Sequence, residues 1–423
     1  MATYQLSNTL SPLALELLNT TDEQFATFDE GAKAGLIELA PVVLPEHPLG
    51  DNNHLGFAEA TKSGDTLVVI HRRMTGHNPW GAGKADEHSS FTMTTTSNDG
   101  GASWTESFNM RDAMAPSCKD RGGLIPLSHR FSHGPVNHSK KGYKLHLNGL
   151  GTSREGTVVI LCNYGAFRSE DKGRTWEHLS EQFREDTTEG DMLFVGSRIV
   201  DHPDLGLCAF ANSVGYGRNA KFPNPVDGPV EGTRSDFVLL TSDDDGRTWN
   251  RADHKLPRWA AQYEPAPVIH EGDIYIMARD ELARTSHLQI RVSGGVPVDV
   301  RRASMRQARS VEDAALDFNP VTGRFEVVRS VREEMRVELW SIDPEEWESA
   351  EWRFEGTLFA RNQGTPDFYK TSDGYHPTGA VVDPEKGVQY IFIYSGHPCG
   401  PAGSFMIRRT LDTPALARFL SKR

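Results

Sequence analysis

The segment Ser97-Asn98-Asp99-Gly100-Gly101-Ala102-Ser103-Trp104 decides the fold, because its pattern S-x-D-x-G-x-[ST]-W occurs three times in the chain. The second copy is 169–176 (SEDKGRTW) and the third is 242–249 (SDDDGRTW). Their tryptophans are 72 and 73 residues apart, so a unit of nearly constant length repeats. The aspartate can accept backbone N–H bonds inside a tight loop, the glycine permits positive φ, and the tryptophan can pack between neighbouring units. We therefore predict that each copy is a hairpin turn in a repeated β-sheet unit.

Pairs of short apolar strands joined by tight turns accompany these copies and continue beyond them. Six pairs can be read from the sequence: 54–61 with 66–72, 143–151 with 157–163, 192–200 with 206–212, 266–270 with 273–279, 314–319 with 324–330, and 379–383 with 388–395. Turns of only a few residues leave no room for the crossover helices that a parallel sheet needs. The pattern predicts an all-β protein, a β-propeller of four-stranded antiparallel blades.

We expect one domain over residues 1–423, since no linker or low-complexity run divides the chain. The N-terminal segment 1–45 is expected to pack on the propeller, with a helix within 11–28. Residues 36–44 either belong to a further blade or lend a strand to the last one. A second helix is expected at 413–420, where Pro414 suits a first helical turn. Six and seven blades are both open.

Composition excludes several classes of protein. Lys+Arg 45 against Asp+Glu 58 gives a formal net charge of −13, so nucleic acid is not an expected partner. No run approaches the roughly 18 apolar residues that span a bilayer, so no membrane association is expected. The first 25 residues contain no Lys or Arg, unlike a signal peptide. As written, the chain is expected to be cytoplasmic, or secreted if a signal has been removed.

The propeller architecture also predicts which end carries the function. The repeated S-x-D-x-G turns and the short inner-strand turns share one end, where they leave little room. Longer connections meet at the other end, and loops on a rigid scaffold are where binding usually occurs. Eleven of the 16 histidines fall in or beside those connections: His47, His54, His77, His88, His129, His133, His138, His146, His287, His376 and His397.

Histidine, tyrosine and arginine around a funnel suit an anionic sugar. Arginine pairs with a carboxylate in bidentate fashion, and histidine or tyrosine can move a proton. Glycoside hydrolysis needs two carboxyl groups beside one bond. The acids expected at this end are few: Asp86, Glu87, Asp191 and Glu264. That scarcity favours elimination over hydrolysis.

The three repeated turns resemble the Asp boxes of sialidases and other Asp-box β-propellers, and the blade pattern over about residues 54–410 resembles the sialidase superfamily. The resemblance slightly favours seven blades. In sialidases a glutamate at the position of Glu264 activates a tyrosine nucleophile, and an arginine at the position of Arg279 helps grip the substrate carboxylate. The first blade departs from the pattern, because Asn53-His54-Leu55-Gly56-Phe57 stands where sialidases carry Arg-Ile-Pro.

The histidine-rich loops are similar in residue type to the β-propeller polysaccharide lyases, of the ulvan lyase or rhamnosyl-glucuronate lyase type. This resemblance implies β-elimination at a 4-linked uronate in an acidic oligo- or polysaccharide. A cation neutralises the carboxylate, a base removes the C5 proton, and an acid protonates the departing O4. The resemblance implies that Arg279 and His88 neutralise the carboxylate, that His133 or His138 is the base, and that Tyr216 is the acid, with its pKa lowered by Arg218. The residues implied to line the subsites are His54, Arg72, Glu264 and His376.

Other functions remain open. The chain could be an exo-glycosidase, either sialidase-like or a histidine-dependent rhamnosidase, or a glycan-binding propeller without catalysis. No cofactor is required by the sequence. A structural calcium ion held by backbone carbonyls would leave no sequence trace, and a zinc site from His397 and Cys399 is conceivable. The sugar identity, the endo or exo mode and the oligomeric state are not encoded in any recognisable pattern.

Overall fold

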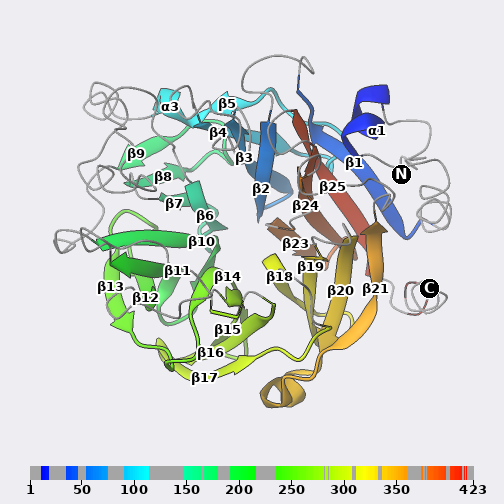
Figure 1. The fold of residues 1–423 in the computed structure, drawn as a ribbon. Helices are drawn as coiled ribbons and strands as arrows, with labels where there is room; N and C mark the ends of the chain where they lie inside the picture. Colours follow the sequence, from blue (N-terminus) through cyan, green and yellow to red (C-terminus); the bar gives the residue numbers. More distant parts are fainter. Residues whose placement is uncertain are drawn as a thin grey trace, which may run out of the picture.

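The chain forms a ring of antiparallel β-sheets around a central axis (Figure 1). A computed structural model describes residues 11–18, 35–45, 54–74, 90–113, 147–162, 165–179, 191–215, 235–280, 282–283, 285–306, 311–331, 336–360, 373–374, 379–396 and 401–411, with Pro377, Pro414 and Leu416. Within these residues the strands group into six four-stranded units, which we call blades 1 to 6 in ring order. The all-β propeller prediction is confirmed.

Each blade runs from an inner strand at the axis to an outer strand at the rim. The inner strands are β2 (His54–Ser63), β6 (Leu147–Thr152), β10 (Asp191–His202), β14 (Gln262–His270), β18 (Val311–Asn319) and β23 (Gly379–Asp383). The second strands are β3 (Thr66–Met74), β7 (Val158–Cys162), β11 (Gly206–Gly215), β15 (Asp273–Asp280), β19 (Arg324–Val331) and β24 (Val388–Gly396). These pairs are the six that the sequence predicts.

The two outer positions complete the blades. The third strands are β4 (Ser90–Ser97), β8 (Gly165–Ser169), β12 (Ser235–Ser242), β16 (His287–Ser293), β20 (Arg336–Ile342) and β25 (Ala402–Thr410). The fourth strands are β5 (Phe108–Asn109), β9 (Glu177–Leu179), β13 (Asn250–His254), β17 (Val296–Arg302), β21 (Arg353–Ala360) and β1 (Ile37–Val43). The remaining elements described are α1 (Pro12–Leu18), α3 (Met110–Ala113), the 3-10 helix η6 (Pro344–Ser349) and β22 (Asp373–Gly374), which pairs with the end of β24.

The N-terminal strand closes the ring. β1 pairs antiparallel with β25, so the last blade takes its outer strand from the beginning of the chain. At the axis, a Cβ on Gly379 of blade 6 would lie 2.7 Å from the Ala60 amide nitrogen of blade 1, so these two inner strands touch directly. Residues 36–44 therefore lend a strand to the last blade, which is the second of the two roles predicted for them. Within the described residues the strands form six blades.

The hydrophobic core lies between the blades rather than inside them. Six buried apolar clusters each join two neighbouring blades, because a sheet with two apolar faces must cover both. Representative members of the successive interfaces are Ile70 with Ile160, Val159 with Val238, Phe210 with Ile276, Met277 with Val327, Val328 with Ile391, and Val69 with Phe392. Helix α1 covers the interface of blades 5 and 6, where the Ser395 hydroxyl donates to the Leu17 carbonyl.

Each of the three repeated turns is a hairpin turn, as predicted, and they connect the third and fourth strands of blades 1 to 3. In the second copy the Ser169 hydroxyl accepts from the Gly173 amide and donates to Asp171, whose carboxylate also accepts from the amide and hydroxyl of Thr175. These bonds lower the pKa of the Asp171 carboxyl against the effect of burial. Each tryptophan packs against the preceding blade, so the turns fasten neighbouring blades together.

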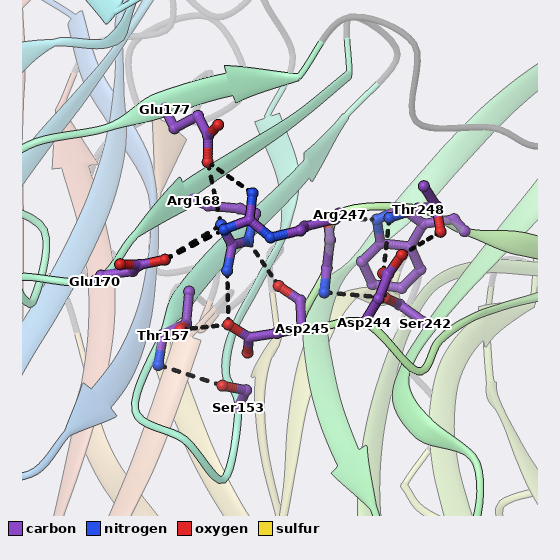
Figure 2. A network of polar contacts seen from close by, with 12 residues as sticks. Ser153, Thr157, Arg168, Glu170, Glu177, Ser242, Asp244, Asp245, Arg247 and Thr248 are labelled. Carbon is purple, nitrogen blue, oxygen red and sulfur yellow. Dashed lines mark hydrogen bonds and ion pairs between the residues drawn. The ribbon is translucent and has the colours of Figure 1, made fainter.

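An ion network adds to this fastening between blades 2 and 3 (Figure 2). The buried Arg168 side chain on β8 donates to the backbone carbonyl and carboxylate of Asp245 in the third repeated turn, at 2.7 and 2.6 Å, and to Glu177 at 3.1 Å. Thr157 donates to the same Asp245 carboxylate. Asp245 has a φ of 60°, a conformation that the surrounding bonds must hold. The network therefore positions the third turn against blade 2.

Candidate active site

The inner strands begin with a shared irregularity. Five of the six shift register near their first residues: between Gly56 and Glu59, Leu147 and Gly149, Val195 and Ile199, Tyr263 and Ala266, and Val311 and Ala314. Such β-bulges bend a strand and re-aim its side chains, and they are common beside active sites. We call this end of the propeller the bulge end; the repeated turns lie at the opposite end. Charged residues from several blades meet at the bulge end.

Blades 1 and 4 face each other across the six-membered ring and use one backbone arrangement (Figure 1). Phe57 has a φ of 56° in the bulge of β2, and Glu264 has a φ of 55° in the bulge of β14. This region is unfavourable for bulky side chains, and such strain clusters at functional sites. In both blades an arginine of the second strand lies opposite the residue before the bulge: Arg72 opposite Gly56, and Arg279 opposite Tyr263.

Aromatic rings hold Arg72 in place. Its guanidinium lies 4.6 Å from the centre of the Phe57 ring, and Phe57 packs at 4.9 Å against Tyr394 of blade 6. The His54 ring meets the edge of Tyr394 at 5.6 Å and is fully buried. The strained Phe57 therefore supports a cation that is half-buried and pre-oriented.

Arg279 is held by groups of its own blade. One guanidinium nitrogen lies 3.5 Å from a carboxylate oxygen of Glu264, and the guanidinium lies 5.6 Å from the centre of the Tyr263 ring. Both charged side chains keep some exposure, 16% for Arg279 and 21% for Glu264. An anionic ligand can reach this arginine, and the carboxylate beside it can exchange a proton with that ligand.

Two further carboxyl groups belong to this end. Glu59 closes the bulge of β2 and is 4% exposed. Burial raises the pKa of its carboxyl well above 4.5; Arg72 acts in the opposite direction, and Asp313 adds to the rise. Asp313 lies within the bulge of β18 in blade 5, so charges from two separate blades influence one carboxyl group. Glu59 thus keeps its proton at a pH where an exposed glutamate has lost it.

Arg198 crosses the centre of the ring. From the bulge of β10 in blade 3 it donates to the Leu316 carbonyl at 2.8 Å and to the Asp317 carboxylate at 2.7 Å, both in blade 5. It also donates to the Ala380 carbonyl of blade 6. Asp317 in turn accepts from Gln389, which accepts from Arg409. The side chain therefore bridges three blades across the axis.

The predicted site residues divide into two groups. Arg72, Glu264 and Arg279 lie at the bulge end with partial exposure, and His54 lies at the same end but is buried between blades 1 and 6. The His54 ring contacts Tyr394, which packs against Phe57 beside Arg72. The role of His54 as a subsite residue stays a prediction. The other predicted residues lie outside the described part of the chain: His88, His133, His138, Tyr216, Arg218 and His376.

Sequence reasoning missed three charged residues at this end: Glu59, Arg198 and Asp313. It searched the connections between strands, whereas these residues lie within strands. What the three share is a position in or beside the bulge of an inner strand, which the sequence does not mark. Glu59 and Asp313 add two carboxyl groups to the acids that the sequence assigned to this end, and the preference for elimination stays a prediction.

Two further features to consider are groups of metal-ligating side chains and helices long enough to span a membrane. Among the described residues, no group of three or more His, Cys, Asp or Glu side chains is arranged to hold a metal ion. Both His397 and Cys399, the conceivable zinc ligands, lie outside those residues. No helix in the described ranges has the length and apolar character needed to cross a membrane.

Comparison with known proteins gives the fold class. No protein-family model and no curated protein matches the chain. Among solved structures it is similar to a protein of unknown function from Dyadobacter fermentans, with 15% identity, a TM-score of 0.58, and coverage of 88% of this chain and 99% of that one. It is also similar to Trypanosoma rangeli sialidase in complex with sialic acid, with 11% identity, a TM-score of 0.53, and coverage of 90% and 60%. A leech intramolecular trans-sialidase complexed with 2,7-anhydro-Neu5Ac gives 10% identity, a TM-score of 0.56, and coverage of 90% and 72%.

The fold is that of the sialidase-like β-propellers. At 10 to 15% identity these similarities define the architecture, and the chain spans about 60% of the length of the Trypanosoma sialidase. What this chain does at its bulge end has to be argued from its own residues.

Proposed function

We propose that the chain is a carbohydrate-active enzyme that cleaves a glycosidic bond of an acidic glycan at the bulge end. The observation that carries the proposal is the matched placement of Arg72 and Arg279. They come from opposed blades, lie in equivalent register beside strained bulges, and are both held by aromatic rings. Two pre-oriented guanidinium groups at one end of the propeller suit a carboxylate-bearing sugar. The sialidase-like fold is consistent with such a ligand.

Hydrolysis is the reaction that the described residues favour. Glu264 and Asp313 lie in the bulges of β14 and β18, which belong to adjacent blades. In hydrolysis one carboxyl group donates a proton to the departing glycosidic oxygen. The other assists a water molecule or attacks the anomeric carbon, and the elements of water are added across the broken C–O bond. Burial raises the pKa of the Glu59 carboxyl and Asp313 adds to the rise, against the effect of Arg72, so Glu59 contributes less negative charge near Arg72 than an exposed glutamate would.

β-Elimination is the alternative, and it depends on His88, His133, His138 and Tyr216. Both reactions are tested by incubating the protein with sialylated and uronate-containing glycans while following reducing ends and ultraviolet absorbance together. Reducing ends without a chromophore indicate hydrolysis, and an unsaturated uronate chromophore indicates elimination. Binding without either product identifies a glycan-binding propeller and refutes the proposal.

Variants locate the reaction. Glu264→Gln and Arg279→Met should abolish most of the cleavage. Arg251→Met is the matched control, because Arg251 lies on the outer strand β13 and pairs with Asp253. Equal losses in all three variants would contradict a site at the bulge end. No resident cofactor is part of the proposed reaction.

A further inference from the structure

Three arginines gather around one buried carboxylate at blade 5. Arg329 on β19 is 1% exposed, and Glu338 beside it on β20 is fully buried. One Glu338 oxygen accepts from Nε and Nη2 of Arg329, at 3.1 and 2.9 Å, and from the Trp340 indole at 2.8 Å. The other oxygen accepts from Nε of Arg336 at 2.7 Å, and the backbone carbonyl of Arg306 accepts from Arg329 at 2.8 Å. We call Arg306, Arg329, Arg336 and Glu338 the arginine cluster.

The arginine cluster carries more positive charge than its carboxylate balances. Three guanidinium groups and one carboxylate give these four residues a net charge of +2. A carboxylate offers about four lone-pair sites, and the hydrogen bonds from Arg329, Arg336 and Trp340 already use those of Glu338. Burial lowers the pKa of Arg329, and the charges of Arg336 and Arg306 lower it further, against the effect of Glu338. The cluster therefore attracts a further anion.

The arginine cluster faces the Arg279 side chain across the interface of blades 4 and 5. Met277 on β15 and Val327 on β19 belong to the apolar core of this interface. Arg279 and Arg329 each stand two residues nearer the bulge end on these strands, so the alternation of side chains directs both into the same interface. Sheets that stack face to face lie about 10 Å apart. Neighbouring sugar residues of one glycan chain can therefore reach both positions.

We propose that Arg306 and Arg336 bind a second anionic group of the glycan, a carboxylate or a sulfate ester on a sugar residue next to the one that Arg279 holds. The proposal rests on the proposed function, since it adds a second acid-binding subsite to the same end. Arg336 begins β20 opposite Val331, the last residue of β19, so it lies at the bulge end.

The two arginines differ from their buried partners in accessibility. Arg306 is exposed, and the Arg336 side chain keeps 17% of its surface accessible. Glu338 orients Arg336 from below without reaching the ligand, and a guanidinium fixed in this way loses little entropy when an anion binds. The preferred substrate is therefore a glycan that carries acidic groups on consecutive residues.

The Trp340 indole reports on this subsite, because its N–H donates to the carboxylate that also holds Arg336. The full chain is labelled with ¹⁵N-tryptophan, and Trp340→Phe assigns the signal. The probes are tetrasaccharides of unsulfated chondroitin, with an acid on every second residue, and of chondroitin 4-sulfate and galacturonate, with an acid on every residue. We expect the Trp340 signal to move with the last two probes only, and a response to one of them alone identifies the anion as sulfate or carboxylate. A signal that no probe moves, or that unsulfated chondroitin moves equally, overturns the proposal.

Affinities measured by calorimetry give the second test. Arg306→Gln and Arg336→Gln should each weaken the binding of the responding probe about tenfold, the loss typical of one charge-assisted contact, and should leave unsulfated chondroitin unaffected. Because Arg306 is exposed, its variant keeps the test valid where Arg336→Gln fails to fold. Arg353→Gln is the matched control, because Arg353 is a 52% exposed arginine at the other end of blade 5.

Cleavage separates this subsite from the proposed function. A protein that cleaves acidic glycans and binds every probe equally well with and without Arg306 and Arg336 overturns the second subsite and leaves the proposed function standing. A selective loss of affinity in the two variants of a protein that cleaves nothing supports the second subsite and overturns the proposed function.

Discussion

Replacing Glu59 with glutamine should change how the stability of the protein depends on pH. Burial raises the pKa of the Glu59 carboxyl well above 4.5, Arg72 opposes the rise, and Asp313 adds to it. In the unfolded chain the same carboxyl titrates near its ordinary pKa of 4.5. Between the two pKa values the unfolded state therefore binds fewer protons than the folded state. In that range the free energy of unfolding falls as the pH rises.

The size of the effect follows from one proton. The contribution of Glu59 to stability is complete below pH 4.5 and is lost as the pH rises toward the folded pKa, at about 1.4 kcal/mol per pH unit. Glutamine has nearly the same shape and no proton to lose. The Glu59→Gln variant should therefore gain stability relative to the wild type by about 1.4 kcal/mol for each pH unit in this range. Arg72→Met should extend the range upward, because it removes the cation that lowers the Glu59 pKa.

Urea unfolding followed by tryptophan fluorescence measures this difference from pH 4.5 to about pH 8. Glu271→Gln is the matched control, because the Glu271 side chain is 85% exposed and should leave the pH profile unchanged. Parallel profiles for the wild type and Glu59→Gln would mean that the buried carboxyl does not retain its proton. In that case our account of the charges beneath Arg72 would be refuted.

Three further predictions concern the blades and the site. Gly246 and Gly272 have similar φ values, 81° and 83°, but a Cβ on Gly246 would lie 2.9 Å from both methyl carbons of Val159, whereas a Cβ on Gly272 would meet no atom within 4 Å. Gly246→Ala should therefore lower the free energy of unfolding in urea by about 1 to 3 kcal/mol more than Gly272→Ala. Arg168→Met should lower the free energy of unfolding by about 3 kcal/mol in the same measurement, because it leaves the Asp245 carboxylate without its cation. If Arg168→Met caused an equal loss in a protein that already carries Asp245→Asn, the pairing of Arg168 with Asp245 would be contradicted. Arg279→Met should lower kcat/KM for an acidic glycan about a hundredfold and Arg279→Lys by less, and an unchanged value would exclude Arg279 from the site.

The hairpins of the fold could be read from the sequence because their signals are local. The spacing of Ser97, Asp99, Gly101 and Trp104 encodes a turn through bonds within eight residues, and the neighbouring strands carry continuous apolar runs. The number of blades could not be read, because it depends on how faces far apart in the chain pack. The pairing of β1 with β25 and the contact of Gly379 with Ala60 are examples, because both join segments from the two ends of the chain.

The candidate site was partly predictable for a related reason. Arg72, Glu264 and Arg279 stand near strand ends, where topology alone assigns them to one end of the propeller. Glu59 and Asp313 were missed because they lie within strands and not in the connections, and bulges that re-aim strand side chains have no local sequence signal. His54, which the sequence assigned to a subsite, is buried and meets the edge of the Tyr394 ring, and its role stays a prediction.

The bonds of Arg198 to Leu316, Asp317 and Ala380 place a side chain of blade 3 across the centre of the described ring. In the glycan-cleaving enzyme proposed above, a polymer passing along the axis would meet this side chain. Such an enzyme would therefore admit its substrate and release its product at the same end, and it would act on chain termini or side branches.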